Sequence, residues 1–385
     1  MKNVCLLGAT GSIGTQVLDL IRERNDEYNL VSMSFNTNFE KAQEIIDEFH
    51  PILVCSYSGI NDSFRLKNPN LKIVTGDEGL IKVANFDADN PIVVNSLVGS
   101  VGLLPTVKAI EDGRDVYLAN KETLVIGGEI VMAKAEEYGV EIIPIDSEHS
   151  AIKQIIDGRC HDDIKRLIIT ASGGSFRDLK REELVNVTKE DALKHPNWHM
   201  GAKITIDSAT MMNKGFELIE AHYLFNIPME QIEPILHRES IVHSMVEFKD
   251  GSIFAQIGSS DMHLPIKYAL EGPRHTASSC IEPLSLTKLS NLHFEVLDTE
   301  RYPMVTYAVA AIKKGGIYPT ILNAANEAAV HLFLKGEIKF LDIERIVKES
   351  LANPKYQIYT NEELTLDLIL KVDKIVKEDV LHGNI

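Results

Sequence analysis

The stretch CLLGATGSIGTQVLDLI, residues 5–21, decides how the N-terminal part of the chain folds. An apolar run leads into Gly8, Gly11 and Gly14, and apolar residues then recur at helical spacing, which predicts a strand, a tight turn and a helix. Glycines let the backbone approach a pyrophosphate closely, and a helix start offers free N–H groups and the positive end of the helix dipole. The stretch therefore predicts a dinucleotide site, with a tight turn that holds no ligand as the alternative.

The whole chain divides into segments of different pattern. In 1–145, short β-rich runs alternate with amphipathic stretches, which is typical of a Rossmann-like α/β domain with a parallel sheet. In 146–270, polar loops separate four runs that we expect to form strands, so this segment is predicted to be a central α+β catalytic domain; the runs are RLIIT, KITID, SIVHSMVEF and SIFAQIG. The Pro-containing segment 271–297 is expected to be a linker, and helical spacing in 298–385 predicts a small C-terminal helical domain.

Charge and cysteine content narrow the functions that the chain can have. A formal net charge of -17 over 385 residues repels nucleic acid and anionic membrane surfaces, so neither is expected as a partner. The sequence shows no signal-peptide pattern and no apolar run of about 18 residues, so a cytoplasmic location is expected. Cys5, Cys55, Cys160 and Cys280 lack CxxC spacing, which predicts buried thiols rather than disulfides or a zinc site.

The end of the expected second strand bears on which nicotinamide cofactor is bound. A site that prefers NAD usually carries an acidic residue there for the ribose 2′-hydroxyl. Residues 34–38, SFNTN, contain none, and the first acidic side chain is Glu40. This favours a 2′-phosphate and therefore NADP, with Thr37 and Asn38 as candidate donors.

Two carboxylates follow the apolar run IIPI. Asp146 and Glu148 lie two residues apart, and on a strand both side chains would point to one face. Converging carboxylates suit a hard cation such as magnesium or manganese. The alternative is a solvated turn that caps a helix.

A third carboxylate comes from the stretch 208–225, whose pattern predicts a helix. Lys214, Glu217 and Glu220 recur every three residues and therefore share roughly one face. That face is either part of a metal site or an exposed row of ion pairs.

Two loops carry donors that suit a phosphate group. TASGGSFR, residues 170–177, follows an expected strand and presents Ser172 beside two glycines. Ser208, Asn213 and Lys214 supply the same kind of donors in the next segment. Either loop could also be an ordinary turn.

HPNWHMG, residues 195–201, contains the only tryptophan of the chain. The segment has neither helical nor strand periodicity, so Trp198 is either part of a lid that excludes water or a core residue on a buried loop. Tyr117 and Lys121 match the YxxxK pair of short-chain dehydrogenases, which requires a helix. Because DVYLANK is predicted to be a strand, the two side chains would lie about 13 Å apart, and we discount the pair.

Together these motifs resemble those of one enzyme family, 1-deoxy-D-xylulose 5-phosphate reductoisomerase. GATGSIG, LANKE, PIDSEH, SGGSFR, HPNW, DSATMMNKG and LNAANE follow one another in the family's order between residues 8 and 327. The resemblance implies an enzyme of non-mevalonate isoprenoid biosynthesis that depends on NADPH and on Mg²⁺ or Mn²⁺. It would convert 1-deoxy-D-xylulose 5-phosphate, a phosphorylated sugar, to 2-C-methyl-D-erythritol 4-phosphate by rearrangement and hydride transfer. We also expect a homodimer, because helical C-terminal domains and acidic cytosolic enzymes often accompany that state.

The resemblance assigns roles residue by residue. Its metal ligands are the three carboxylates that the spacing also selects, Asp146, Glu148 and Glu217, and Glu220 matches a supporting acidic position. Its catalytic residues are Lys121, Glu148 and Glu217. Its substrate contacts are Ser147, Glu148, Ser172, His195, Trp198, Ser208, Asn213, Lys214 and Glu217. Its cofactor contacts are Thr10, Gly11, Ser12, Ile13, Asn36, Thr37, Asn38, Asn120, Lys121, Glu122, Gly201 and Met262.

The chain departs from the family at two places. Many members carry Gly-Lys where this chain has Asn36-Thr37, which weakens the cationic grip on a 2′-phosphate, and His199 stands where a smaller residue is common.

Two other functions stay open. Aspartate semialdehyde dehydrogenase-type enzymes also begin with GATG but need a nucleophilic cysteine, and Cys160 lies in a charged segment. A non-catalytic NADP-binding sensor would bind NADPH but neither manganese nor substrate.

Overall fold

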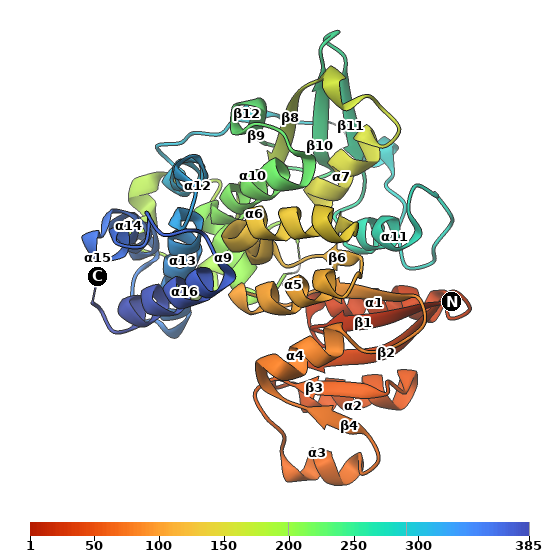
Figure 1. Cartoon of the computed structure of the whole chain (residues 1–385). Coiled ribbons are helices and arrows are strands. Elements are labelled where there is room, and N and C mark those ends of the chain that lie inside the picture. Colours follow the sequence, from red (N-terminus) through yellow and green to blue (C-terminus); the bar gives the residue numbers. More distant parts are fainter. Residues whose placement is uncertain (199, 290, 385) are drawn as a thin grey trace. The chain divides into compact units, whose positions relative to one another are not determined.

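A computed structural model describes residues 1–198, 200–289 and 291–384 of the chain (Figure 1). Contacts between residues group the chain into two compact units. The first unit comprises residues 1–123, 131–150 and 262–282, and the second comprises residues 124–130, 151–261 and 283 onward.

The first unit is built on a parallel sheet of seven strands in the order β4-β3-β2-β1-β5-β6-β7. The strands are β1 Lys2–Leu7, β2 Tyr28–Phe35, β3 Leu53–Ser56, β4 Lys72–Val74, β5 Pro91–Asn95, β6 Val116–Leu118 and β7 Ile142–Pro144. This confirms the predicted parallel sheet. The strand order reverses between β1 and β5, and the carboxyl ends of strands at such a reversal are where Rossmann-like sheets bind nucleotides.

Helices pack against this sheet. They are α1 Ser12–Glu23, α2 Phe39–Phe49, α3 Asp62–Lys67, α4 Gly76–Ala84, α5 Leu103–Glu111 and α11 His263–Glu271, while α6 Lys121–Tyr138 has residues in both units. Helix α1 buries Val17, Leu18 and Ile21 in one core with Val4 and Leu6 of β1. Each such side chain contributes roughly 1.5–3 kcal/mol when fully buried, so their burial holds α1 against the sheet.

The second unit contains a mixed sheet of five strands in the order β11-β10-β8-β9-β12. The strands are β8 Ile164–Ala171, β9 Ile232–Leu236, β10 Val242–Phe248, β11 Ile253–Ile257 and β12 Glu295–Val296. Strands β8 and β9 are parallel, and the remaining pairs are antiparallel. Three of the four runs expected as strands are confirmed, since RLIIT lies within β8, and SIVHSMVEF and SIFAQIG contain β10 and β11.

The fourth run, KITID, was predicted wrongly, because it lies in helix α9. The helices of the second unit are α8 Lys189–Ala192, α9 Ala202–Thr210, α10 Met212–Phe225, α12 Pro303–Lys314, α13 Tyr318–Lys335, α14 Phe340–Ala352, α15 Pro354–Gln357 and α16 Leu366–Leu381, and α7 Ser147–Ile156 runs into this unit from the first. Short 3₁₀ helices lie at Ser100–Gly102, His161–Asp163, Arg181–Asn186, Met229–Gln231 and Leu286–Lys288. Among the described helices, none combines the length and the apolar character needed to cross a bilayer.

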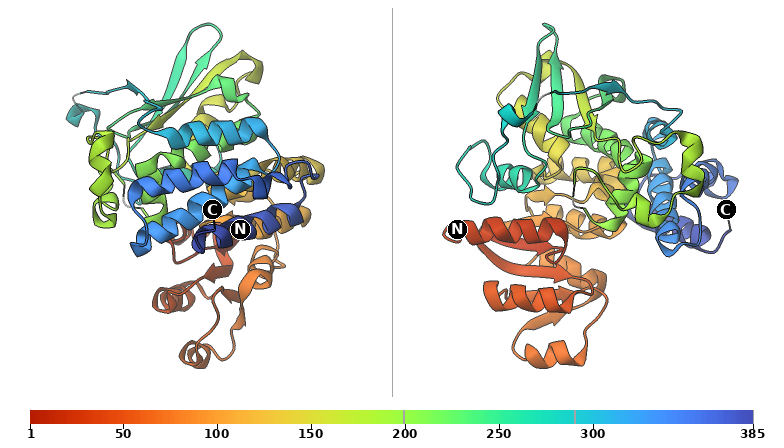
Figure 2. Two further views of the ribbon diagram at one scale, coloured as in Figure 1. Left: turned by 90° about the vertical axis from the view of Figure 1, so that its left-hand side faces the viewer. Right: turned by 180° about the vertical axis from the view of Figure 1, so that it is seen from behind.

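The C-terminal helices pack against the rest of the second unit. Helix α13 lies beside α14 and α16 (Figure 2), α12 packs against α10, and α13 also reaches α9. The predicted helical spacing in the C-terminal stretch is confirmed by α16, which buries Leu368, Val372 and Val376. Residues 283 onward therefore share one compact unit with the helices of the expected catalytic segment.

Segment 262–282 groups with the first unit, where α11 packs against α1. The hydroxyl of Tyr28 on β2 donates a hydrogen bond of 2.8 Å to the carbonyl of Leu270 in α11. The sequence-based division with boundaries at 145, 270 and 297 stays a prediction, and it did not anticipate that this segment returns to the sheet.

Candidate active site

The glycine-rich turn after β1 is shaped by packing at two of its three glycines. Gly8 has a φ of +87°, and a Cβ on it would lie 2.7 Å from the carbonyl oxygen of Ser96. A Cβ on Gly14 would lie 2.3 Å from the carbonyl oxygen of Gly8. Gly11 caps α1 without a side-chain hydrogen bond, and the first turn of α1 carries no acidic residue. The start of α1 is therefore suited to an anionic group such as a pyrophosphate.

The end of β2 is tied to this turn. The Gly8 N–H donates to Ser34 Oγ at 2.9 Å, and the Ala9 N–H donates to the Ser34 carbonyl at 2.8 Å. The exposed residues 36–38 follow directly, and Asn38 caps α2 by accepting from the Lys41 N–H at 3.0 Å. Thr10 to Ile13 and Asn36 to Asn38 thus lie on neighbouring loops at one edge of the sheet.

Asn120 shapes the loop that follows β5. Its buried amide donates to the carbonyls of Leu97 and Gly99, both at 3.0 Å, and to the Glu122 carboxylate at 2.9 Å. The next residue, Lys121, begins α6. Tyr117 lies in β6, as expected, so Tyr117 and Lys121 do not share a helix and the YxxxK pair is discounted on structural grounds.

Asp146 joins Lys121 to the start of helix α7. One oxygen of Asp146 accepts from the N–H groups of Glu148 at 3.1 Å and His149 at 3.4 Å, while the other pairs with the Lys121 ammonium. Burial alone would raise the pKa of Asp146, but Lys121 and His149 hold it well below its usual range.

The expected strand geometry of Asp146 and Glu148 was wrong, because β7 ends at Pro144 and Glu148 lies in the first turn of α7. Asp146 does cap a helix, as the alternative supposed, but its side chain is only 13% exposed and the turn is not solvated. The Ser147 hydroxyl donates to the Glu148 carboxylate at 2.5 Å. Two carboxylates therefore lie in a partly buried, hydrogen-bonded turn of the first unit.

Helix α10 carries the corresponding groups of the second unit. Glu217 accepts from the Asn213 amide at 2.5 Å and pairs with the Lys214 ammonium, and both members of that ion pair are at most 3% exposed. Glu220 is buried as well. The alternative of an exposed ion-paired face is therefore wrong for this helix.

Four possible anion donors lie in the second unit and are called here the phosphate cradle: Ser172 in the loop after β8, Ser208 in α9, and Asn213 and Lys214 in the first turn of α10. A Cβ on Gly174 would lie 2.5 Å from the carbonyl oxygen of Ser208, so the loop after β8 packs directly on the end of α9. Met211, with a φ of +64°, turns the chain from α9 into α10, whose first turn carries Asn213 and Lys214 and no acidic residue. Hydroxyls, an amide, an ammonium group and a helix start are the donors that an anion requires.

His195 determines which hydrogen Ser172 can offer. The Nδ1 atom of His195 accepts from the N–H groups of Trp198 at 2.9 Å and Asn197 at 3.2 Å, so the proton of the neutral ring is on Nε2. Burial, together with the charge of Arg177, lowers the pKa of His195 to about 4, and the ring is neutral at physiological pH. Its Nε2–H donates to Ser172 Oγ at 3.1 Å, and the Gly174 N–H donates to the same oxygen at 3.2 Å. With both lone pairs engaged, the Ser172 hydroxyl is left to donate its own hydrogen.

Sequence reasoning missed two residues, Arg177 and Asn197, that hold the loop after β8 and the segment 195–198 in place. The Arg177 guanidinium donates to the carbonyls of Ser172 at 3.2 Å and Arg238 at 2.8 Å. The Asn197 amide donates to the same Arg238 carbonyl and to Ser240 Oγ, both at 2.7 Å. Arg177 ends the quoted motif TASGGSFR and Asn197 lies within HPNW, but nothing in either pattern shows that they converge on one carbonyl 41 residues away from Asn197.

The remaining expected residues are placed as follows. Trp198 is half-buried beside the His243 ring, with ring centroids 6.0 Å apart, so it is not a core residue. Gly201 caps α9, while Met262 caps α11 and, like Ile13, packs against the core of the first unit. His199 lies outside the described residues. Cys5 and Cys55 are buried as expected, but the expectation was wrong for Cys160, which is exposed, and Cys280 is only half-buried.

Comparison with known proteins settles the family. Models of three 1-deoxy-D-xylulose 5-phosphate reductoisomerase domains match residues 4–128, 142–225 and 257–379. The 1-deoxy-D-xylulose 5-phosphate reductoisomerase of Geobacillus sp. strain WCH70 is 51% identical over 97% of both chains. The chain belongs to the 1-deoxy-D-xylulose 5-phosphate reductoisomerase family. The member from Bacillus subtilis strain 168 is 54% identical and covers 91% of this chain and 92% of its own.

Solved structures of family members match over almost the whole chain. One, in complex with NADPH, fosmidomycin and magnesium, is 38% identical with a TM-score of 0.94 and covers 99% of this chain and 98% of that one. The Zymomonas mobilis member, in complex with NADPH, is 39% identical with a TM-score of 0.88 and the same coverage. These matches confirm the α/β fold with its Rossmann-like N-terminal part and helical C-terminal part.

Proposed function

We propose that the chain converts 1-deoxy-D-xylulose 5-phosphate to 2-C-methyl-D-erythritol 4-phosphate, using NADPH and Mg²⁺ or Mn²⁺. Family membership over nearly the full length supports this activity. The structural observation that carries it is the phosphate cradle, because two of its donors, Asn213 and Lys214, lie on the same first turns of α10 as the buried carboxylate of Glu217.

The cradle binds the phosphate group of the substrate in this proposal. Ser172 and Ser208 donate hydroxyl hydrogens, Asn213 donates amide hydrogens, and Lys214 supplies the positive charge. Charge-assisted hydrogen bonds of this kind are roughly twice as strong as neutral ones. Binding of this remote group provides interaction energy that orients the reacting carbon atoms.

The donor set fits a hard divalent cation. Asp146, Glu148 and Glu217 each offer a carboxylate oxygen, which magnesium and manganese prefer over softer ligands. Lys121 pairs with Asp146 and Lys214 pairs with Glu217, so two of the three carboxylates lie beside a positive charge. A bound cation would stabilise the negative charge that develops on neighbouring oxygens of the substrate.

The edge of the first sheet where the strand order reverses would hold the cofactor. Residues 10–13 at the start of α1 would bind its pyrophosphate, and residues 36–38 would bind its ribose. Ile13 and Met262, which pack against one core, would contact the nicotinamide. Asn120 fixes the loop after β5.

The loop that carries His195 and Trp198 closes over the substrate. Its root is fixed by the Asn197 amide and by the His195 contact with Ser172, so the loop is anchored at the phosphate end. Closure of Trp198 would keep water away from reactive intermediates.

The decisive test is oxidation of NADPH in the presence of 1-deoxy-D-xylulose 5-phosphate, with and without manganese. Turnover should require manganese and should be lost in Glu217→Gln, which keeps the shape of the side chain but removes its charge. Glu230→Gln, an exposed carboxylate of the same unit, is the matched control and should behave as the native chain. Turnover without added metal, or full activity of Glu217→Gln, would refute the proposal.

Two rival functions give different outcomes in simple assays. An aspartate semialdehyde dehydrogenase-type mechanism requires a cysteine nucleophile, so alkylation of the exposed Cys160 would abolish activity, whereas we expect no effect. A non-catalytic sensor would bind NADPH but show no affinity for manganese. Manganese binding, detected by electron paramagnetic resonance and weakened in Glu217→Gln, distinguishes an enzyme from a sensor even without turnover.

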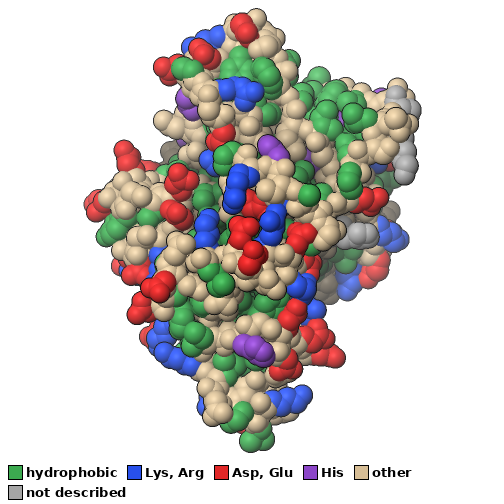
Figure 3. Space-filling view, turned by 90° about the vertical axis from the view of Figure 1, so that its right-hand side faces the viewer, with side chains coloured by type: hydrophobic (Ala, Val, Ile, Leu, Met, Phe, Trp, Pro, Cys, Tyr) green, Lys and Arg blue, Asp and Glu red, His purple; other side chains and the backbone are tan. Residues whose placement is uncertain are grey.

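We also propose that the protein is a cytoplasmic homodimer. Strand β11 lies at the edge of the five-stranded sheet and exposes Ile253, Phe254 and Ile257, with exposed fractions of 52%, 44% and 44%. Hydrophobic side chains also reach the surface at the top of the view in Figure 3. An exposed apolar edge strand is an aggregation hazard unless it is paired, and pairing with a second copy removes the hazard. Sedimentation should give a dimer for the native chain and a monomer for Ile253→Lys/Ile257→Lys, while Val296→Lys on the opposite edge strand is the control.

A further inference from the structure

The ribose end of the cofactor site lies between two loops that carry no cationic side chain. Residues 36–38 are Asn-Thr-Asn, and residues 57–61, after β3, are Tyr-Ser-Gly-Ile-Asn. Both loops leave the sheet at the carboxyl ends of adjacent parallel strands, β2 and β3. In a Rossmann-like site, this is where an acidic residue selects NAD or a basic one accommodates the 2′-phosphate of NADP.

Hydrogen bonds hold these loops beside the glycine-rich turn and beside each other. The Gly8 N–H donates to Ser34 Oγ, so the end of β2 is held against the glycine-rich turn. The Ser58 hydroxyl donates to the Asn36 side chain and joins the two loops. Asn36, Thr37 and Ser58 are all exposed, so their neutral hydroxyl and amide groups face solvent where a 2′-substituent would lie.

Acidic groups surround the two loops. Glu40 lies in the first turn of α2 and Asp62 in the first turn of α3. The nearest cation along the chain, Lys41, is paired with Glu44 at 2.8 Å. A 2′-phosphate placed here would therefore meet neutral donors and nearby negative charge.

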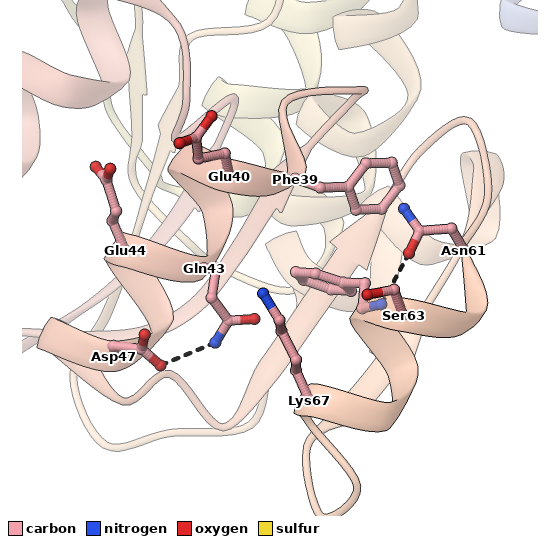
Figure 4. Close-up of a pocket in the computed structure, with 9 residues that line it drawn as sticks. Phe39, Glu40, Gln43, Glu44, Asp47, Asn61, Ser63 and Lys67 are labelled. Carbon is pink, nitrogen blue, oxygen red and sulfur yellow. Dashed lines mark hydrogen bonds between the residues drawn. The ribbon is translucent and has the colours of Figure 1, made fainter.

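A cavity of about 630 Å³ between α2 and α3 extends this acidic surrounding (Figure 4). Three of its lining residues on α2 are acidic, Glu40, Glu44 and Asp47, and α3 contributes Lys67 as the one basic lining residue. Because that lysine faces three carboxylates, the cavity does not provide a net positive field for a phosphate.

We propose that this chain accepts NADH as well as NADPH, because its 2′-subsite is neutral. The proposal rests on the cofactor assignment made above and specifies which residues set the preference: Asn36, Thr37 and Ser58. A neutral hydrogen bond changes affinity by about fivefold, whereas a charge-assisted one changes it by about tenfold to a hundredfold. We therefore expect the dissociation constants of NADPH and NADH to differ by no more than about tenfold.

The test is a direct binding measurement that needs neither metal nor substrate. Each reduced nucleotide is titrated into the full chain, and the fluorescence of its nicotinamide reports binding at low and high salt. Thr37→Lys places a cation at the subsite and should tighten NADPH at least about tenfold without changing NADH, and the gain should fall with salt. Asn36→Asp should shift the preference towards NADH. Ile52→Lys, which adds the same charge at the opposite end of β3, is the matched control.

Each outcome decides the proposal. Native affinities within about tenfold, with opposite shifts in Thr37→Lys and Asn36→Asp, support it. A native preference for NADPH above about a hundredfold would overturn it and require a cation from elsewhere in the chain. Equal gains for both nucleotides in Thr37→Lys would overturn the assignment of the subsite. Binding of neither nucleotide would overturn the cofactor assignment itself, and this proposal with it.

Discussion

Replacing Gly174 by alanine tests whether close packing of two loops creates the phosphate cradle. Gly174 has a φ of +71°, which costs an alanine about 1–2 kcal/mol. Its added Cβ would lie 2.5 Å from the Ser208 carbonyl oxygen and 2.8 Å from the Ala209 Cα, so the loop must move away by roughly 1 Å. Overpacking of this kind costs a further 1–3 kcal/mol or so. We expect Gly174→Ala to lower the free energy of unfolding by about 2–5 kcal/mol.

The same displacement should weaken catalysis, because Ser172 and Ser208 would no longer face one phosphate. A misplacement of about 1 Å can reduce turnover by about a hundredfold, and the loss should be accompanied by a higher KM for the phosphorylated substrate. Urea unfolding followed by the fluorescence of Trp198 measures the stability. Steady-state kinetics with the reductoisomerase substrate measures the second effect.

Gly158→Ala is the matched control for this experiment. Gly158 lies in the same unit with a φ of +75°, but a Cβ there would meet nothing within 4 Å. It shares the backbone strain and the loss of chain entropy in the unfolded state, so the difference between the two variants isolates the contact with Ser208. Equal stability of the two variants, or an unchanged KM in Gly174→Ala, would refute the packing argument.

Three smaller perturbations test other parts of the structure. In an NMR titration, His195 should show a pKa of about 4. Arg177→Met should raise that pKa but leave it below 6.5, because burial is the larger cause of the shift. Because the unfolded chain takes up this proton near pH 6.5, the free energy of unfolding should fall as the pH drops from 6.5 to 4. Tyr28→Phe removes a buried hydrogen bond to α11 and should cost about 1 kcal/mol in urea unfolding, whereas an unchanged midpoint would show that this contact contributes nothing. Asn326→Ala removes the 2.8 Å hydrogen bond that the Asn326 amide donates to the buried Asp207 carboxylate. It should lower the free energy of unfolding by about 2 kcal/mol, measured as a lower melting temperature in calorimetry.

The sequence predicted the first unit well because its signals are local. The glycines at 8, 11 and 14 specify a strand, a turn and a helix within 17 residues, and alternating runs specify the parallel strands. The prediction that all three glycines serve the approach of a pyrophosphate was incomplete. Gly8 is required by its contact with Ser96, which is visible only when β1 and β5 are paired, and Gly14 is required by its contact with Gly8 inside the turn.

Prediction failed where burial removes the periodic signal. Helix α9 buries every residue from Thr205 to Thr210, so its apolar positions do not form one stripe, and KITID alternates like a strand. The prediction for Asp146 was wrong for another reason. An aspartate after a strand can extend the strand or cap the next helix. Here it caps the helix, because the N–H groups of Glu148 and His149 donate to it in the folded chain.

The carboxylates could be selected from the sequence, but their electrostatic partners could not. Asp146 and Lys121 are 25 residues apart, and no spacing rule connects the end of one strand with the start of a helix after another. The spacing of Lys214 and Glu217 on α10 can be read from the sequence, but the burial of this ion pair cannot. Burial decides how much the pair matters for stability. An exposed pair contributes little, whereas a buried carboxylate without its partner costs several kcal/mol. Lys121 is therefore needed beside the partly buried Asp146 and Lys214 beside the buried Glu217, and neither requirement can be read from the spacing of charged residues.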